Sequence, residues 1–84
     1  MKQITLPSQR TAIIRDGNGQ SLLNAQRTAR QPDEIPYALV AELVEIDEQK
    51  IVYEDVLEMH IADVLTLIAE VNGLAGKQYL PLSM

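Results

Sequence analysis

The sequence predicts a mostly α-helical domain in which three to four short helices follow a short N-terminal β element. Apolar residues recur at steps of three and four over most of residues 33–74, as they do on one face of a helix. The clearest β-prone runs lie earlier, within residues 4–15. The 84 residues of the chain allow one hydrophobic core, so we assign a single small helical domain to residues 1–76 and an apolar C-terminal tail to residues 77–84.

The predicted β element consists of two short runs. Ile4–Leu6 is β-prone and is stopped by Pro7, and Thr11–Arg15 is a second run of the same kind. Pairing between these two runs is a hypothesis.

The turn signal at Asp16–Gly19 allows two interpretations, since Asp-Gly and Asn-Gly both supply the positive φ that tight turns require. The turn either closes a hairpin onto Ser21–Leu23 or separates a strand from a helix. We favour the helix, because Ser21 can cap its first turn. Helical spacing continues beyond this residue, at Leu22, Ala25, Gln26 and Ala29.

A second helix is predicted after the break at Gln31–Asp33. Asp33 is a suitable N-cap, and Pro36 suits the first turn, where a missing N–H costs little. The apolar face of this helix would comprise Leu39, Val40, Leu43 and Ile46. Another face would carry an acidic row at steps of three: Glu42, Glu45 and Glu48. We interpret the row as a solvated face, and a surface for a basic partner is the alternative.

The longest periodic segment is Tyr53–Leu74, in which Asp55 can cap the first turn and Gly73 suits a left-handed exit. A kink is expected near Met59-His60. The predicted core face comprises Ile61, Val64, Leu65, Ile68 and Val71, and the other side carries Asp63, Thr66 and Glu70. Ala62 and Leu67 lie away from this core face, so the helix would offer apolar surface both to its own core and to a partner.

The tail at residues 77–84 is too short and too interrupted by proline to form a helix, yet it is apolar. Its apolar residues must dock either on this domain or on another chain. The residues predicted to bind a partner are therefore Ala62, Leu67, Tyr79, Leu80 and Leu82.

Composition excludes several classes of function. The chain has no cysteine, which excludes disulfides, thiolate chemistry and zinc-finger spacing, and its one histidine, His60, cannot make a multi-histidine metal site. No apolar run reaches the length of a membrane span, and the first residues lack the apolar core of a signal peptide. We expect a soluble cytoplasmic protein that uses no cofactor, no metal and no membrane.

The net charge of −5 is unevenly distributed. Residues 1–30 carry five basic residues and one acid, whereas residues 31–84 carry eleven acids and two lysines. An acidic body without a basic stripe disfavours DNA or RNA as a partner. The two halves would instead attract each other, within one molecule or between neighbours. So short a chain has a small core, which also favours self-association or a protein partner.

Two clusters of polar residues lack part of what a catalytic or metal site requires. His60 and Asp63 have the helical spacing of a base and its orienting carboxylate, but no activated serine or cysteine accompanies them. The acids Glu54, Asp55 and Glu58 lack the alternating ligands and central glycine of a calcium loop, and the dipole of a helix N-terminus explains them. We therefore expect no enzymatic activity.

The order of these elements resembles that of the small tail assembly chaperones of contractile-tailed phages and Mu-like prophages. The resemblance covers roughly residues 12–74 and is carried by two segments, P-Y-A-L-V-A-E-L-V-E-I and V-L-E-M-H-I-A-D-V-L-T-L-I-A-E-V-N-G. In the second segment, Leu57, Asp63, Leu67 and Val71 would occupy the recurrent positions of the family. The tail residues Tyr79–Leu82 do not align with the family pattern.

The resemblance implies a non-catalytic role. Proteins of this family bind the tape-measure protein, keep its long apolar helices soluble, and are displaced as tail-tube subunits polymerise around it. Two other classes remain open. A small structural subunit of a phage tail or baseplate would use the same apolar faces permanently. An acidic regulatory or antitoxin-like protein would block a basic surface with the row Glu42, Glu45 and Glu48.

Overall fold

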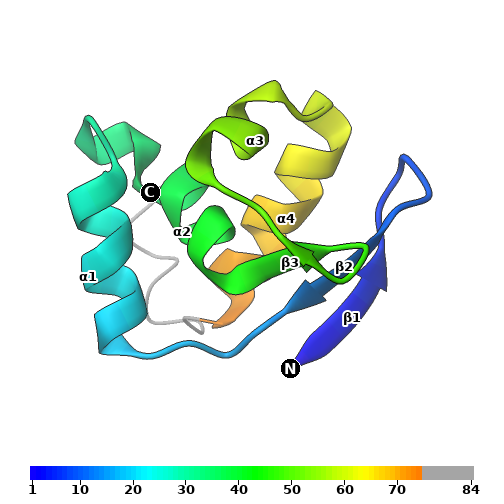
Figure 1. Cartoon of the computed structure of the whole chain (residues 1–84), viewed down its shortest axis with the longest axis horizontal. Coiled ribbons are helices and arrows are strands. Elements are labelled where there is room, and N and C mark those ends of the chain that lie inside the picture. Colours follow the sequence, from blue (N-terminus) through cyan, green and yellow to red (C-terminus); the bar gives the residue numbers. More distant parts are fainter. Residues whose placement is uncertain (75–84) are drawn as a thin grey trace.

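The computed structural model describes residues 1–74, in which four α-helices and a four-stranded antiparallel sheet form an α+β domain (Figure 1). In chain order the elements are β1 (Lys2–Thr5), β2 (Thr11–Ile14), α1 (Gly19–Thr28), a 3₁₀ turn (Pro32–Glu34), α2 (Ile35–Leu43), β3 (Val44–Ile46), β4 (Gln49–Lys50), α3 (Tyr53–Glu58) and α4 (Ile61–Leu74). The expected helices are present, but the sheet extends beyond the expected N-terminal element. The tail assigned to residues 77–84 lies outside the described residues.

The hypothesis that the first two β-prone runs pair is confirmed. β1 and β2 are antiparallel over their full length, and Thr5 lies opposite Thr11. The loop between them closes because the Gln9 N–H donates to the Leu6 carbonyl (2.8 Å). Gln9 has a φ of 76°, as expected for the left-handed residue that ends a three-residue hairpin loop. The hairpin therefore has a short, well-defined tip at residues 7–9.

The middle of the chain adds two strands that the sequence pattern does not predict. Val44 and Ile46 of β3 are buried while Glu45 between them is partly exposed, which is the alternation of a strand. The three-residue step from Leu43 to Ile46 imitates a helical repeat, and the expectation of a continuing helix is wrong because α2 ends at Leu43 and β3 pairs with β2. A two-residue turn, Asp47-Glu48, in which both residues have positive φ, leads into β4.

The turn at Asp16–Gly19 leads into a helix, as the favoured interpretation predicts. Asn18, rather than Ser21, is the N-cap of α1. The Asn18 side-chain oxygen accepts the Ser21 N–H (3.1 Å), and the Ser21 hydroxyl oxygen accepts the Asn18 N–H in return (3.2 Å). Gly17 has a φ of 74°, and a Cβ atom there would lie 2.6 Å from the buried side chain of Leu43. This turn therefore needs glycine both for its backbone conformation and for its contact with α2.

α2 begins one residue later than a cap at Asp33 would place it. Asp33 lies inside the preceding 3₁₀ turn, and the residue at the cap position of α2 is Glu34. The Glu34 carboxylate accepts a hydrogen bond from the buried Tyr53 hydroxyl of α3 rather than from the N–H groups of its own helix. Pro36 stands in the first turn of α2, as expected.

The C-terminal helical segment is interrupted where the kink is expected. Met59 and His60 separate α3 from α4, so the segment is two helices rather than one. The N-cap of α3 is Val52 rather than Asp55, which is the third residue of the helix; the Asp55 Oδ2 atom accepts the Val52 N–H (3.0 Å) and so closes the first turn. Gly73 lies within α4 and has no positive φ, so the prediction that it forms a left-handed exit is wrong.

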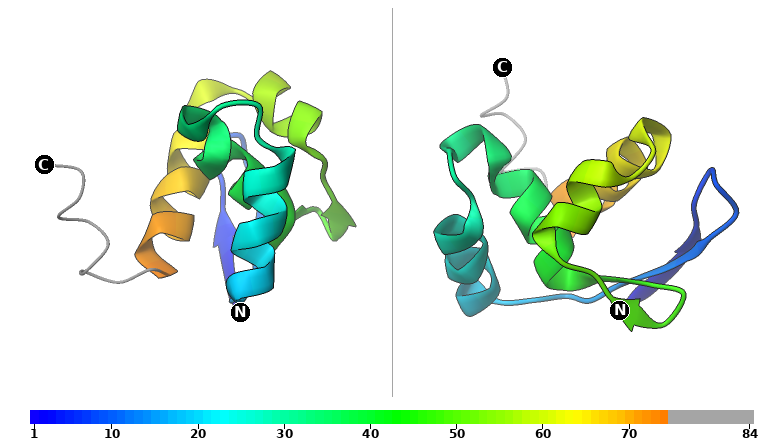
Figure 2. Two further views of the ribbon diagram at one scale, coloured as in Figure 1. Left: turned by 90° about the vertical axis from the view of Figure 1, so that its left-hand side faces the viewer. Right: turned by 45° about the horizontal axis from the view of Figure 1, so that its top comes forward.

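The core lies between one face of the sheet and helices α2, α3 and α4 (Figure 1). Strands contribute residues at alternate positions, and each of these helices contributes a buried stripe. The buried members are Leu6, Ala12, Ile14, Val40, Leu43, Val44, Ile46, Val56, Val64, Leu67 and Val71. Figure 2 shows α1 beside α2, where a smaller cluster of Ala25, Ala38 and Tyr53 is buried.

The two oppositely charged halves of the chain meet within the molecule. Three ion pairs each join a basic residue of the first half to an acid of the second: Lys2–Glu70 (2.8 Å), Arg10–Asp47 (3.4 Å) and Arg30–Glu54 (3.7 Å). Most of these side chains are exposed, so each pair contributes on the order of 1 kcal/mol or less. The intramolecular attraction expected from the charge distribution is therefore confirmed.

We expect Gly17→Ala to lower the free energy of unfolding by about 1–3 kcal/mol, because alanine disfavours positive φ and its methyl group would displace Leu43. Urea denaturation measures the change. Gly19→Ala is the matched control, since nothing lies within 4 Å of a Cβ atom at that position. Equal midpoints for Gly17→Ala and the unsubstituted protein would contradict the described turn.

Candidate protein-binding surface

The outward face of α4 differs from the predicted one. Val64 and Val71 are buried as expected and Ile68 is partly buried, but Ile61 is 70% exposed and Leu65 is 61% exposed. The assignment of Ile61 and Leu65 to the core is therefore wrong. Leu67, predicted to face a partner, has 0% of its surface exposed and belongs to the core, so that placement is also wrong. Relative to the expectation, α4 is rotated about its axis.

A buried carboxylate accounts for this rotation. Asp63, expected on the polar side of the helix, is 2% exposed. Its Oδ1 accepts the Ser8 N–H (3.1 Å) and its Oδ2 accepts the Ser8 hydroxyl (2.6 Å), both from the tip of the β1–β2 hairpin. A buried carboxylate needs such donors, so Asp63 has to face the hairpin. At about 100° per residue, Ile61 and Leu65 each lie about 160° around the helix from Asp63 and face away.

A second contact holds the other half of α4 against the same hairpin. The Lys2 Nζ atom of β1 lies 2.8 Å from Oε1 of Glu70, about two helical turns beyond Asp63. Glu70 is only partly exposed, which strengthens this pair relative to a fully solvated one. The hairpin thus contacts α4 at two points along its length.

The exposed apolar residues of α4 lie in one row, which we call the outer stripe: Ile61, Leu65 and Ala69. Residues four apart share one face of a helix, and the row extends over about 12 Å of the helix axis. Ile68 borders the outer stripe from the core side, and Leu57 of α3, which is 47% exposed, precedes it in the chain. Apolar residues clustered on one exposed face are typical of a protein-interaction site.

Apart from Leu67, one predicted partner-binding residue lies within the described part of the chain. Ala62 is partly buried beside the outer stripe, and its backbone is engaged in the first turn of α4. Its N–H donates to His60 Nδ1 (3.1 Å), and its carbonyl accepts the Thr66 hydroxyl (2.8 Å). The remaining predicted residues, Tyr79, Leu80 and Leu82, lie outside residues 1–74.

Ile61 and Leu65 are the binding candidates that the sequence pattern misses. One signal for them exists: the apolar residues of α4, from Leu67 round to Ala69, occupy an arc of about 200°. One face of a small sheet covers less than that. Which part of the arc stays uncovered depends on the contact between Asp63 and Ser8, and no local pattern reveals a contact between residues 55 positions apart.

The His60–Asp63 pair does not form a catalytic arrangement. Asp63 is turned inward to Ser8, whereas His60 is exposed and its Nδ1 atom accepts the Ala62 N–H. His60 therefore lies on the surface, directly before α4. Within residues 1–74, no three or more histidine or acidic side chains come together as metal ligands would.

The acidic row predicted on the second helix does not exist as one face. Glu42 lies in α2, where its Oε2 atom accepts a hydrogen bond from Asn24 (3.1 Å). Glu45 lies in β3 opposite Lys50, and Glu48 lies in the following turn. The prediction of a shared helical face is wrong because α2 ends before two of the three glutamates.

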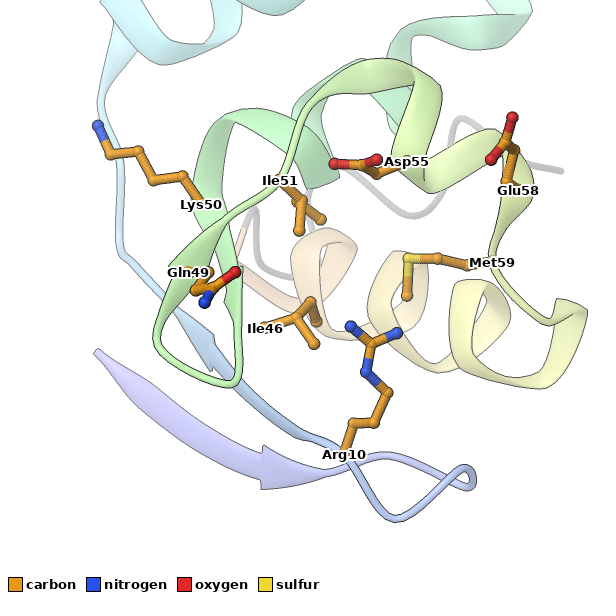
Figure 3. Close-up of a pocket in the computed structure, with 8 residues that line it drawn as sticks. All are labelled: Arg10, Ile46, Gln49, Lys50, Ile51, Asp55, Glu58 and Met59. Carbon is orange, nitrogen blue, oxygen red and sulfur yellow. The ribbon is translucent and has the colours of Figure 1, made fainter.

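A depression of about 290 Å³ lies between the strands and α3 (Figure 3). It is lined by Arg10, Ile46, Gln49, Lys50, Ile51, Asp55, Glu58 and Met59. Figure 3 shows the Arg10 guanidinium reaching between Ile46 and Met59, while the Glu58 carboxylate points away from it. Basic and acidic side chains are mixed in this lining, so the depression does not select a ligand of either charge.

Comparisons with models of known protein families, with curated proteins and with solved structures found no match for this chain. No helix within residues 1–74 combines the length and the apolar character that crossing a membrane requires. The outer stripe and the family resemblance are therefore the guides to function.

We expect Asp63→Ala to lower the free energy of unfolding by about 1–3 kcal/mol, because it leaves the Ser8 N–H and hydroxyl without their acceptor. Urea denaturation is again the measurement. Asp33→Ala removes an exposed acid and should change stability by no more than about 0.5 kcal/mol. Equal effects of the two substitutions would show that the contact between Asp63 and Ser8 does not support the fold.

The rotation of α4 is tested by two leucines on its opposite sides. Leu67→Ala should cost about 2–5 kcal/mol, as a buried large-to-small change does, whereas Leu65→Ala should cost less than about 1 kcal/mol. Thermal denaturation of both variants gives the comparison. The reverse order of melting temperatures would show that the face predicted from the sequence, with Leu65 buried, is the correct one.

Proposed function

We propose that this chain is a non-enzymatic tail assembly chaperone of a phage or prophage, which acts in the host cytoplasm. In this proposal it binds the tape-measure protein during tail morphogenesis and keeps the apolar helices of that protein soluble. The single observation that supports a binding role is the outer stripe. Ile61 and Leu65 are large apolar side chains that remain more than half exposed on a domain with a small core.

The residues that carry the family resemblance have a different part in this proposal. Asp63, Leu67 and Val71 are buried, so at these positions the pattern supports the fold rather than the contact with a partner. Leu57 is the exposed member of the set and lies close to the outer stripe along the chain. The binding surface would thus be Leu57 with the outer stripe, and Ala62 would lie at its edge. The tail residues Tyr79, Leu80 and Leu82 are part of the same proposal.

A chaperone and a structural subunit would use the same surface, and they differ in where the protein is found after assembly. A chaperone releases its client and is absent from mature particles. A structural subunit is present in them at fixed stoichiometry. The third class, an acidic regulatory protein, loses its basis because the row Glu42, Glu45 and Glu48 is not a single face.

The test is affinity capture of the tagged protein from its native host after prophage induction, with mass spectrometry of the lysate and of purified particles. We expect a long helical tape-measure protein in the capture and none of this chain in particles. Leu65→Asp should reduce capture by about tenfold or more, because a charge would be buried against an apolar client. Presence in particles at fixed stoichiometry would make the chain a structural subunit, and capture of no tail protein would refute both roles.

Leu22→Asp is the matched control for this experiment. Leu22 is 44% exposed on α1, so the substitution adds the same charge to an exposed leucine on another helix. Both variants should keep the melting temperature of the unsubstituted protein within a few degrees, as surface changes do. Equal loss of capture in both would show that net charge, rather than the outer stripe, governs the interaction.

A further inference from the structure

The helices that carry Leu57 and the outer stripe, α3 and α4, are acidic. Residues 53–74 contain five acids and neither lysine nor arginine. The helix pair therefore presents a negative field around its apolar surface, and this field attracts cationic groups and repels anionic ones. The acids do not contribute equally, because most of them are already engaged within the molecule.

Three of the five acids are bound by groups from the first half of the chain. Asp63 accepts its two hydrogen bonds from Ser8. Glu70 pairs with Lys2, and Glu54 pairs with Arg30. Glu70 faces the hairpin, on the opposite side of α4 from the outer stripe, and its charge is balanced by a lysine of the same molecule.

The other end of the outer stripe is different. Glu58 is exposed, and within residues 1–74 it has no cationic partner. It precedes Ile61 by three residues, so the two Cα atoms are at most about 11 Å apart. Figure 3 shows the Glu58 carboxylate directed away from Arg10, the basic residue that lines the same depression. The outer stripe is therefore apolar along its length, and near its N-terminal end lies a negative charge that no cation of residues 1–74 pairs with.

We propose that the outer stripe binds a single amphipathic helix of a partner protein, and that the apolar face of this helix ends in lysine or arginine that lies over Glu58. This inference deepens the proposed function, on which it rests, by specifying the chemistry and the direction of the client helix. The apolar contact supplies affinity, and the charge at one end selects the orientation. A helix with its basic end at its C-terminus would run antiparallel to α4.

A second copy of this chain fits the surface less well. Each copy has a net charge of −5, and beside its own outer stripe lies Glu58, which pairs with no cation of the described part of the chain. Two copies brought together through these helices would gain no cation for that glutamate and would repel each other as acidic bodies. A basic partner helix removes the repulsion and neutralises the Glu58 carboxylate.

Three synthetic helical peptides of about 18 residues test the proposal. They share one leucine and alanine face and differ only in the last turn, which carries two lysines, two glutamines or two glutamates. Fluorescence anisotropy with the full chain should give about two- to fivefold tighter binding of the lysine peptide than of the glutamine peptide, and weaker binding still of the glutamate peptide. The differences should shrink as salt is added.

Two substitutions in the protein separate the apolar and electrostatic parts. Glu58→Lys should reverse the order of the lysine and glutamate peptides, and Leu65→Asp should abolish measurable binding of all three. Asp33→Lys is the control for Glu58→Lys, because it makes the same charge change at an exposed acid beside α2 and should leave the order unchanged.

Each outcome has one meaning. Equal affinities of the three peptides, or an order that Glu58→Lys does not change, would overturn the inference and leave the proposed function standing. Self-association of the peptide-free protein that Leu65→Asp removes would identify a second copy as the occupant and would also overturn it. The expected peptide order together with no tape-measure protein in the capture experiment would support the inference and reject the named client.

Discussion

The contact between Asp63 and Ser8 is the constraint on which the arrangement of this domain depends. It links the tip of the first hairpin to the first turn of the last helix, across 55 positions of sequence. A carboxylate that is 2% exposed requires hydrogen-bond donors, and Ser8, which is itself exposed at the hairpin tip, supplies two of them. Once Asp63 faces the hairpin, Val64, Leu67 and Val71 are directed into the core. Without this anchor, the broad apolar arc of α4 would permit more than one rotation.

The elements defined by local chemistry could be predicted from the sequence. The turn before α1, the break between α3 and α4, and the hydrogen bond of Asp55 in the first turn of α3 all follow from residues close together in the chain. The short strand β3 could not be predicted. Val44–Ile46 forms a strand because it pairs with β2, some thirty residues earlier in the chain. Three residues are also too few to distinguish the alternation of a strand from the spacing of a helix.

The candidate surface was harder to predict than the fold, for a physical reason. Apolar residues indicate which side of a helix can be buried, and on α4 this side is wider than the sheet can cover. Ile61 and Leu65 satisfy the periodicity of a core face as well as Val64 does, yet they lie outside. The deciding residue is polar, and its partner is distant in sequence. Acidic residues usually lie on the solvated side of a helix, so the sequence pattern places Asp63 outside, whereas in the structure it is buried.

The long separation in sequence between Ser8 and Asp63 has a consequence for how the chain folds during synthesis. The first hairpin is made early and can pair locally, but its tip lacks its acceptor until α4 has been made. Closing a loop of this length has a larger entropic cost than forming contacts between residues close in sequence. The final step of folding is therefore expected to be the docking of the last helix onto the first hairpin, and both ends of the described chain become ordered together.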